Sequence, residues 1–482
     1  MRFALAALTF AVFTGAANAD PASQTGADNL TAVLQTYLGA ADGVVTVVPA
    51  GEAYGVTLDF APLIASIPDA GAEASISPVV FQLTDNGDGT WEMTQDQAFD
   101  LALKVPGQLD LVVKFGKWAV SGTFDESMKA FSASASQITD ISVTEVMTDP
   151  TLGETKVAYF AESAQYDSSS TAVASGVVDS SARYVLNGLT ERFSMPGIGE
   201  GAAPIEISIA AETYAADARI TGLRPDAMYK LLAFLVANPS EAAMIAQQDA
   251  VKTILRDGMP LFDHIISTGT VTAISAVSPV GEFGLDEAGV TVEANGFVAD
   301  GLLRQAFTLS GLTTPPGLVP DWATALLPSQ VSLDFKLAGF DLAAPVALML
   351  DVVDFATGPA DPAAFEGQVV AALLPEGVVD ITLAPGGIQA PIYSLAYEAA
   401  MSGGMAAMPS GTAKISLKGM AEVQAALAAA PAEMGAQVAP LLSIAESMAK
   451  PGADGALLWE LELTPEGGLL VNGTDMMAAG AQ

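Results

Sequence analysis

The stretch LDLVVKFGKWAVSGTFDESMKAFSASASQITDISVTEV, residues 109–146, decides the fold, because almost all of it follows strand patterns. Leu109 to Phe115, Trp118 to Phe124 and Ile138 to Val146 alternate apolar and polar residues or are rich in β-branched ones. Both features are typical of β-strands, in which successive side chains point to opposite faces of a sheet. This part of the chain therefore predicts consecutive strands.

Runs of the same kind lie on both sides of this stretch. Thr84 to Thr90, TDNGDGT, separates two of them and contains Asn-Gly and Asp-Gly, which favour a tight hairpin turn. A calcium loop is the alternative, but Gly87 and Gly89 stand where such a loop needs oxygen ligands. The further predicted strands are Val44 to Val48, Tyr54 to Phe60, Val79 to Thr84, Thr90 to Met93, Arg183 to Leu189, Ile205 to Tyr214 and Ala218 to Gly222.

Helical spacing of apolar residues appears first near the N-terminus, where Asp28 is the expected N-cap and Gly39 the expected end. Pro225 opens a second helix, and another is expected from Ser240 to about Arg256. The late predictions are helices at Met420 to Ala430 and Glu433 to Met448, and a closing hairpin at Leu457 to Gly473 with its turn at Pro465 to Gly468.

Together these patterns predict an α+β protein with a large, mostly antiparallel and twisted β-sheet and amphipathic helices packed on one face. The expected organisation is a strand-rich region over residues 20–224, a helical insertion over 225–270 and a mixed strand and helix region over 271–482.

Several predicted strands end in one short pattern: an apolar residue, any residue, Gly, and a residue that is usually apolar. Glycine permits a positive φ at such a point and lets a following helix fold back on the sheet. We interpret the pattern as the strand-to-helix corner of a degenerate repeat unit. Its tight copies are Ile220 to Leu223, Leu309 to Leu312, Leu337 to Phe340 and Leu417 to Met420.

Residues 1–19, MRFALAALTFAVFTGAANA, have the pattern of an export signal. Arg2 provides the positive start, Phe3 to Phe13 the apolar core, and Ala17 to Ala19 a small-residue cleavage site. The apolar run is shorter than the ~20 residues that cross a bilayer, and no Cys follows that could carry a lipid. We expect cleavage after Ala19 and a periplasmic protein, with extracellular release as the alternative.

Composition excludes several kinds of partner. With 18 Lys and Arg against 55 Asp and Glu, the formal net charge is −37, so nucleic acid and anionic membrane surfaces are poor partners. Hydrophobic residues make up 51% of the chain and cysteine is absent, so stability must come from a large packed core without disulfides. No transmembrane segment is expected in the mature chain.

Candidate catalytic residues are few. His264 is the only histidine, and although Asp263 could orient it as a base, its apolar neighbours indicate a packed residue. No Gly-x-Ser-x-Gly elbow occurs in the sequence. The sequence therefore predicts no catalytic, cofactor-binding or metal-ligating residue and no cofactor. A carboxylate-based hydrolase remains the enzyme alternative, but none of the four tryptophans, Trp91, Trp118, Trp322 and Trp459, lies in an acidic aromatic cluster.

The segment TTPPGLVPDWATALLP, Thr313 to Pro328, predicts a short helix capped by Asp321 with Trp322, Leu326 and Leu327 on its apolar side. It would either plug one end of the sheet, which we favour, or act as a lid or docking element over an apolar groove.

The acidic, Ala-rich and Gly-rich chain, the segment Thr313 to Pro328 and the closing DGALLWELELTPEGGLLVNG, residues 454–473, resemble a family of secreted Gram-negative proteins with domain of unknown function 2125. More remotely, the chain is similar to YdgA-like and AsmA-like periplasmic envelope proteins. The resemblance implies a periplasmic setting and an extended sheet, and it implies no activity or site residue.

We therefore expect a non-enzymatic periplasmic protein that binds a lipid or a hydrophobic protein segment, or that supports the cell envelope. The alternatives are the carboxylate-based hydrolase and a scaffold subunit of an envelope complex.

Overall fold

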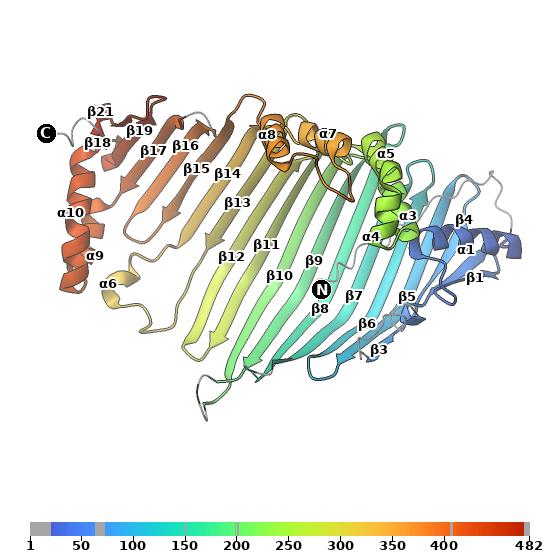
Figure 1. Ribbon diagram of the computed structural model, residues 1–482. Coiled ribbons are helices and arrows are strands. Elements are labelled where there is room, and N and C mark those ends of the chain that lie inside the picture. Colours follow the sequence, from blue (N-terminus) through green and yellow to red (C-terminus); the bar gives the residue numbers. More distant parts are fainter. Residues whose placement is uncertain are drawn as a thin grey trace. The chain divides into compact units, whose positions relative to one another are not determined.

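The computed structural model shows an α+β fold and describes residues 21–62, 73–149, 151, 153–197, 199, 202–404 and 408–476 (Figure 1). The predicted signal, residues 1–19, lies outside the described residues. The chain forms two compact units. Of the described residues, the first unit contains those up to Ile265 together with Val352–Ala360, and the second contains Ile266–Asp351 and those from Asp361 onward.

The first unit contains an antiparallel sheet in which neighbouring strands pair in the order β1, β2, β4, β5, β6, β7, β8, β9, β10. The short strand β3 pairs with the far half of β5. The bounds are β1 Val45–Ala50, β2 Ala53–Leu58, β3 Glu73–Ile76, β4 Val79–Asp85, β5 Thr90–Val105, β6 Leu109–Asp125, β7 Ala130–Asp149, β8 Gly153–Ala174, β9 Val177–Met195 and β10 Ile205–Leu223.

The second unit is entered within β11, and its strands also pair antiparallel, in the order β12, β13, β14, β15, β16, β17, β19, β20, β21, with β18 beside β19. The bounds are β11 His264–Ser278, β12 Gly281–Asn295, β13 Gly301–Ser310, β14 Gln330–Phe340, β15 Val379–Gln389, β16 Ser394–Gly403, β17 Ser410–Lys418, β18 Lys450–Pro451, β19 Leu457–Leu463, β20 Leu469–Val471 and β21 Thr474–Asp475. The predicted large antiparallel sheet and the closing hairpin are confirmed.

The described helices agree with most of the predicted ones. Their bounds are α1 Gln24–Leu38, α3 Pro225–Ala237, α4 Glu241–Ala246, α5 Gln248–Gly258, α6 Asp321–Thr324, α7 Ala343–Val352, α8 Pro362–Leu373, α9 Met420–Ala428 and α10 Ala432–Met448.

Three details of the helix predictions were wrong. The N-cap of α1 is Ser23, whose hydroxyl accepts the Gly26 N–H at 3.1 Å, whereas Asp28 lies one turn inside the helix. The single helix expected from Ser240 is broken at Gln247 into α4 and α5. Asp321 is the first residue of α6 rather than its cap.

Strand β6 is one continuous strand where the sequence predicted two, which were separated at Gly116. Relative to β5, β6 contains one extra residue here, and this β-bulge reverses the alternation, so that Phe115 and Trp118 both contact Phe99. The same irregularity continues into the next strands, where the ladder skips a pair at Asp140, which has a φ of 53°, and at Gly188, which has a φ of 63°. The apolar side chains thus stay on one face.

The four glycines of the strand-end pattern all have positive φ: Gly222 at 67°, Gly311 at 71°, Gly339 at 80° and Gly419 at 84°. A helix begins within four residues of three of them, namely α3, α7 and α9. The pattern therefore marks strand exits, as predicted. Descent of these corners from one repeated unit stays a prediction.

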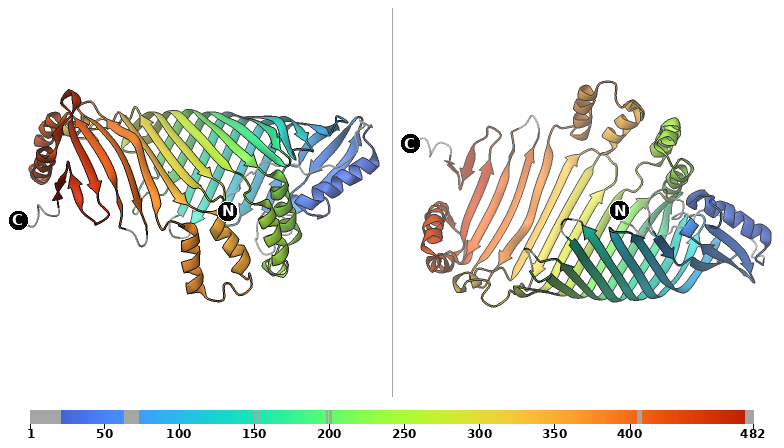
Figure 2. Two further views of the ribbon diagram at one scale, coloured as in Figure 1. Left: turned by 90° about the horizontal axis from the view of Figure 1, so that it is seen from above. Right: turned by 60° about the horizontal axis from the view of Figure 1, so that its bottom comes forward.

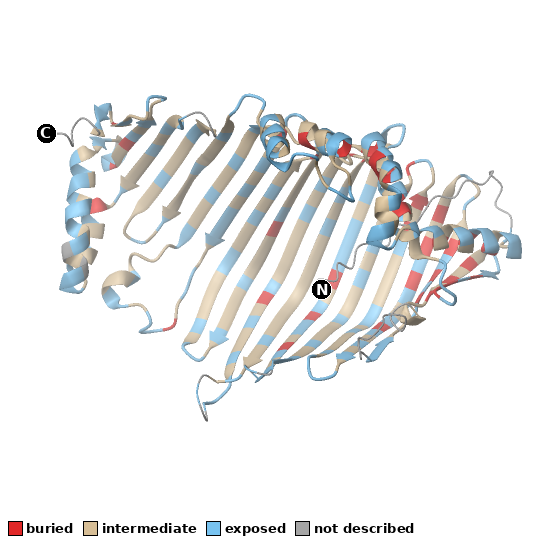
Figure 3. Cartoon of the chain, viewed as in Figure 1, coloured by how far each residue is buried: buried red, intermediate tan, exposed pale blue. Residues whose placement is uncertain are grey.

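Buried residues are concentrated where helices cover the sheets (Figure 3). In the first unit, Leu30 and Leu34 of α1 pack on a core that includes Val56, Phe81 and Phe99, and α1 lies along the first strands in both views of Figure 2. In the second unit, Leu442, Ala445 and Met448 of α10 pack on a smaller cluster that contains Met420, Trp459 and Val471.

The segment Val352–Ala360 is held against α5 of the first unit. Lys252 Nζ donates to the carbonyl of Val353 at 2.6 Å and lies 5.3 Å from the centre of the Phe355 ring. Gln248 donates to Asp354 at 3.1 Å and accepts from the backbone of Phe355 at 2.9 Å. Because Lys252 is only 9% exposed, these contacts satisfy a nearly buried ammonium group.

Candidate functional site

In both units the register places the apolar side chains of the strands on one face. Residues directly opposite each other on paired strands point to the same side, so a row of partners across the strands shows what that face presents. In the first unit two such rows cross β5 to β10, and we call them together the first-unit face. The rows are Leu103, Leu111, Glu145, Val157, Phe193, Ile207 and Leu101, Val113, Val143, Tyr159, Glu191, Ile209.

The second unit shows the same arrangement. Its rows, which we call the second-unit face, contain no charged residue. They are Leu303, Leu337, Ile381, Met401; Leu309, Val331, Ile388, Leu395; and Val290, Phe307, Leu333.

Both faces are covered at one end and open along the rest. The core around α1 reaches Leu101 of the first-unit face, whereas Tyr159 is 38% exposed and Ile209 36% exposed. The cluster around α10 covers β17 and β19 in the second unit, whereas Phe307 is 44% exposed and Leu309 43% exposed. Contiguous exposed apolar surface of this kind marks binding sites more often than chance. The open parts of the two faces are therefore the candidate site.

The opposite face of the second-unit sheet is polar. Arg304 binds Asp334 through two hydrogen bonds at 2.9 and 2.8 Å and Glu293 through a third at 3.0 Å. The guanidinium group lowers the pKa of the Asp334 carboxyl through these hydrogen bonds. This ion triad connects β12, β13 and β14, so the charged side chains on this face form contacts between neighbouring strands.

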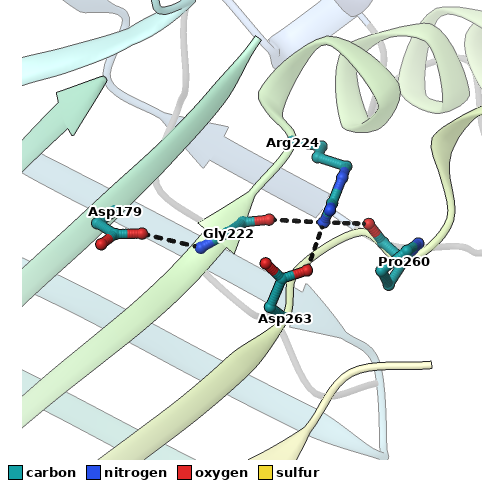
Figure 4. Close-up of polar contacts among 5 residues, drawn as sticks. All are labelled: Asp179, Gly222, Arg224, Pro260 and Asp263. Carbon is teal, nitrogen blue, oxygen red and sulfur yellow. Dashed lines mark hydrogen bonds and ion pairs between the residues drawn. The ribbon is translucent and has the colours of Figure 1, made fainter. Parts of the chain in front are cut away.

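Asp263 and His264, the pair that the sequence raised as a possible base, lie where the chain enters β11. His264 is half-buried at the start of β11. The carboxylate of Asp263 accepts from Arg224 Nη1 at 2.9 Å, and the same guanidinium group donates to the carbonyls of Gly222 at 2.8 Å and Pro260 at 2.7 Å (Figure 4). Arg224 thus links the segment between α5 and β11 to the end of β10.

The segment Thr84 to Thr90 forms the predicted hairpin between β4 and β5, with the Asn86 N–H donating to the carbonyl of Thr90 at 3.0 Å. Nearby, burial raises the pKa of the Glu126 carboxyl, and Trp91 Nε1–H donates to it at 2.8 Å. Among the described residues no group of three or more acidic or histidine side chains could hold a metal ion.

The segment Thr313 to Pro328 ends in a short helix, as predicted. Trp322, Leu326 and Leu327 are half-buried, and Tyr393 Oη–H donates to the carbonyl of Leu326 at 3.3 Å. Helix α6 lies beside α9. An open pocket of about 530 Å³ lies next to the start of α9, between Ile392, Met420 and Leu457. Glu422 and Glu446 also line this pocket.

The sequence did not identify Glu145, Tyr159 and Glu191 as candidates. A glutamate at a position that alternation assigns to the apolar face is the available signal, but only the pairing of β7, β8 and β9 shows that both glutamates adjoin Tyr159.

Comparison with family models, with curated proteins and with solved structures gave no match. Within the part of the chain that the structure describes, no helix has the length and apolar character needed to cross a membrane.

Proposed function

We propose that this chain is a non-enzymatic periplasmic protein that binds lipid acyl chains on the apolar faces of its sheets. One observation carries the proposal: the second-unit face offers rows of uncharged aliphatic and aromatic side chains, and Phe307, Leu309 and Leu333 are each more than a third exposed. Exposure of apolar surface to water is unfavourable, and a large exposed apolar patch on a folded protein is typical of a binding surface.

A lipid suits this surface better than a protein segment. The strands from β13 to β17 have paired neighbours on both sides, so their backbone hydrogen bonds are made within the sheet. The face then offers non-directional apolar contact and few hydrogen-bonding groups. An acyl chain needs nothing more, whereas a peptide would leave its own backbone groups unpaired.

The test is lipid analysis of the full chain purified from periplasm, with two matched double variants. Val290→Gln with Phe307→Gln changes a cross-strand pair on the second-unit face. Thr291→Gln with Thr308→Gln changes the next residue of each strand, on the opposite face. We expect wild type and the threonine variant to carry lipid and the first variant to carry several-fold less.

Native mass spectrometry separates the outcomes. Wild-type protein free of lipid, or lipid retained equally by all three proteins, would contradict the proposal. A stoichiometric protein partner in place of lipid would instead identify a scaffold subunit.

A further inference from the structure

The first-unit face differs from the second in one respect: it contains two carboxylates. Glu145 lies in the row of Val157, and Glu191 in the row of Tyr159, so the two glutamates adjoin the same tyrosine from the strands on either side of it. Both glutamates are half-buried. The other ten residues of the two rows are aliphatic or aromatic. Negative charge therefore sits inside an otherwise apolar surface.

None of the ion pairs found among the described residues includes Glu145 or Glu191. The nearest cations along β8 and β9, Lys156 and Arg192, alternate to the opposite face, and Lys156 pairs there with Glu154 at 2.8 Å. Burial, the charge of Glu191 with its hydrogen bond, and the charge of Glu145 together raise the pKa of Tyr159. The tyrosine therefore stays neutral and supplies a hydrogen-bond donor to one carboxylate.

Half-buried carboxylates without a cation are costly, and covering them with acyl chains alone would cost more. A ligand that covers this face is therefore favoured if it carries its own positive charge beside its apolar part. An ammonium group can bind both carboxylates and lie over the ring of Tyr159, which is 38% exposed.

We propose that the first-unit face selects lipids whose head group carries an ammonium, such as phosphatidylethanolamine, and that Glu145, Tyr159 and Glu191 bind that ammonium. This inference rests on the proposed function. The width of this face is sufficient for an acyl chain. Six strands spaced by about 4.8 Å span about 24 Å, whereas the acyl chains of one leaflet extend over about 15 Å. Anionic head groups are disfavoured by the two glutamates and by the net charge of −37.

In the experiment, delipidated full-length protein is incubated with vesicles that contain equal amounts of phosphatidylethanolamine and phosphatidylglycerol. Both lipids are then quantified on the reisolated protein. We expect wild type to carry about five-fold more of the first, which corresponds to about 1 kcal/mol. In Glu145→Gln with Glu191→Gln the ratio should approach one, while the total lipid bound is retained. Glu154→Gln with Glu206→Gln removes the same charge from the opposite face and should keep the wild-type ratio.

The outcomes distinguish the two proposals. Equal uptake of both lipids by wild type, or an unchanged ratio in the Glu145 and Glu191 variant, overturns head-group selection and leaves lipid binding standing. Absence of both lipids from wild type overturns the proposed function itself. A basic peptide retained from periplasm on this face in place of lipid also overturns head-group selection. Thermal unfolding of each variant confirms that it is folded.

Discussion

Gly222 shows how strictly the backbone limits the choice of residue at a strand exit. Its φ is 67°, its N–H donates to Asp179 at 2.9 Å, and a Cβ added there would overlap the carboxylate of Asp263 (Figure 4). Asp263 cannot move freely, because Arg224 holds it. Two independent constraints therefore disfavour any side chain at position 222: the left-handed backbone conformation and the nearby carboxylate of Asp263.

We expect Gly222→Ala to destabilise the first unit by about 2–4 kcal/mol, since it adds a steric overlap to the strain of a positive φ. Gly176→Ala is the matched control, because Gly176 has a φ of 70° and open space around its Cα. Its expected cost is about 1 kcal/mol. Denaturant unfolding measures both, and equal losses would show that the overlap with Asp263 is relieved without cost.

A second residue-scale prediction concerns Asp226, which accepts from Lys129 and Lys230. These hydrogen bonds lower the pKa of its carboxyl below the ordinary value of 3.8. A lowered folded-state pKa stabilises the protein above that value, and the contribution is lost as pH falls through the folded-state pKa.

Asp226→Asn should therefore lower the free energy of unfolding at pH 7 by about 0.5–1 kcal/mol, a small effect because the group is partly exposed. The difference between the variant and wild type should shrink as the pH falls below about 4. Unfolding curves recorded between pH 7 and pH 3 provide the measurement. A constant difference over that range would contradict the electrostatic origin.

At the scale of elements, α10 depends on one aromatic contact. Trp459 of β19 is 9% exposed, and its indole N–H donates to the carbonyl of Ala445 at 2.8 Å. Trp459→Ala should cost about 3–5 kcal/mol and increase hydrogen exchange throughout α10, because the cluster beneath the helix loses its largest member. Trp459→Phe keeps most of the packing and should cost about 1–2 kcal/mol. Unchanged exchange in α10 after Trp459→Ala would show that other contacts hold the helix.

Elements were also where sequence-based prediction succeeded and failed for identifiable reasons. Alternation located the strands and the positive-φ glycines located their exits, because both signals are local. Two runs were separated at Gly116, since a bulge reverses the alternation there and the sequence does not show that the ladder continues. Ser23 was missed as the cap of α1, because Asp28 is an equally good capping residue and only the start of the helix distinguishes them.

The candidate site could be predicted less well than the fold. Alternation shows that each strand has an apolar side, but it does not show which residues of different strands are partners. The juxtaposition of Glu145, Tyr159 and Glu191 follows from pairing between residues more than ten positions apart. The open part of each face depends in turn on how far α1 and α10 extend over it, and tertiary packing sets that extent.

For the molecule as a whole, bound lipid should raise thermal stability, because a ligand that binds the folded state alone stabilises it by mass action. At a free ligand concentration of about 100 times Kd the gain is about 2.7 kcal/mol. Calorimetry of lipid-loaded and delipidated protein measures the shift. Val290→Gln with Phe307→Gln should reduce the shift, and the variant of Thr291 and Thr308 should not. An equal shift in both variants would place the lipid elsewhere.

The excursion of Val352–Ala360 into the first unit has a consequence for proteolysis. The chain passes between the units after Ile265, after Asp351 and after Ala360, so it crosses three times rather than once. A single cut near residue 265 leaves no covalent link between the two fragments, but the segment 352–360 of the second fragment stays bound to Lys252 and Gln248 of the first. A cut at Asp361 leaves two fragments that are still joined by the pairing of β14 with β15. We expect nicked protein to elute intact under native conditions and to separate into fragments only in denaturant. Domain expression at a boundary near 265 would lack this nine-residue anchor, and adding the peptide 352–360 in trans should restore protection of α5.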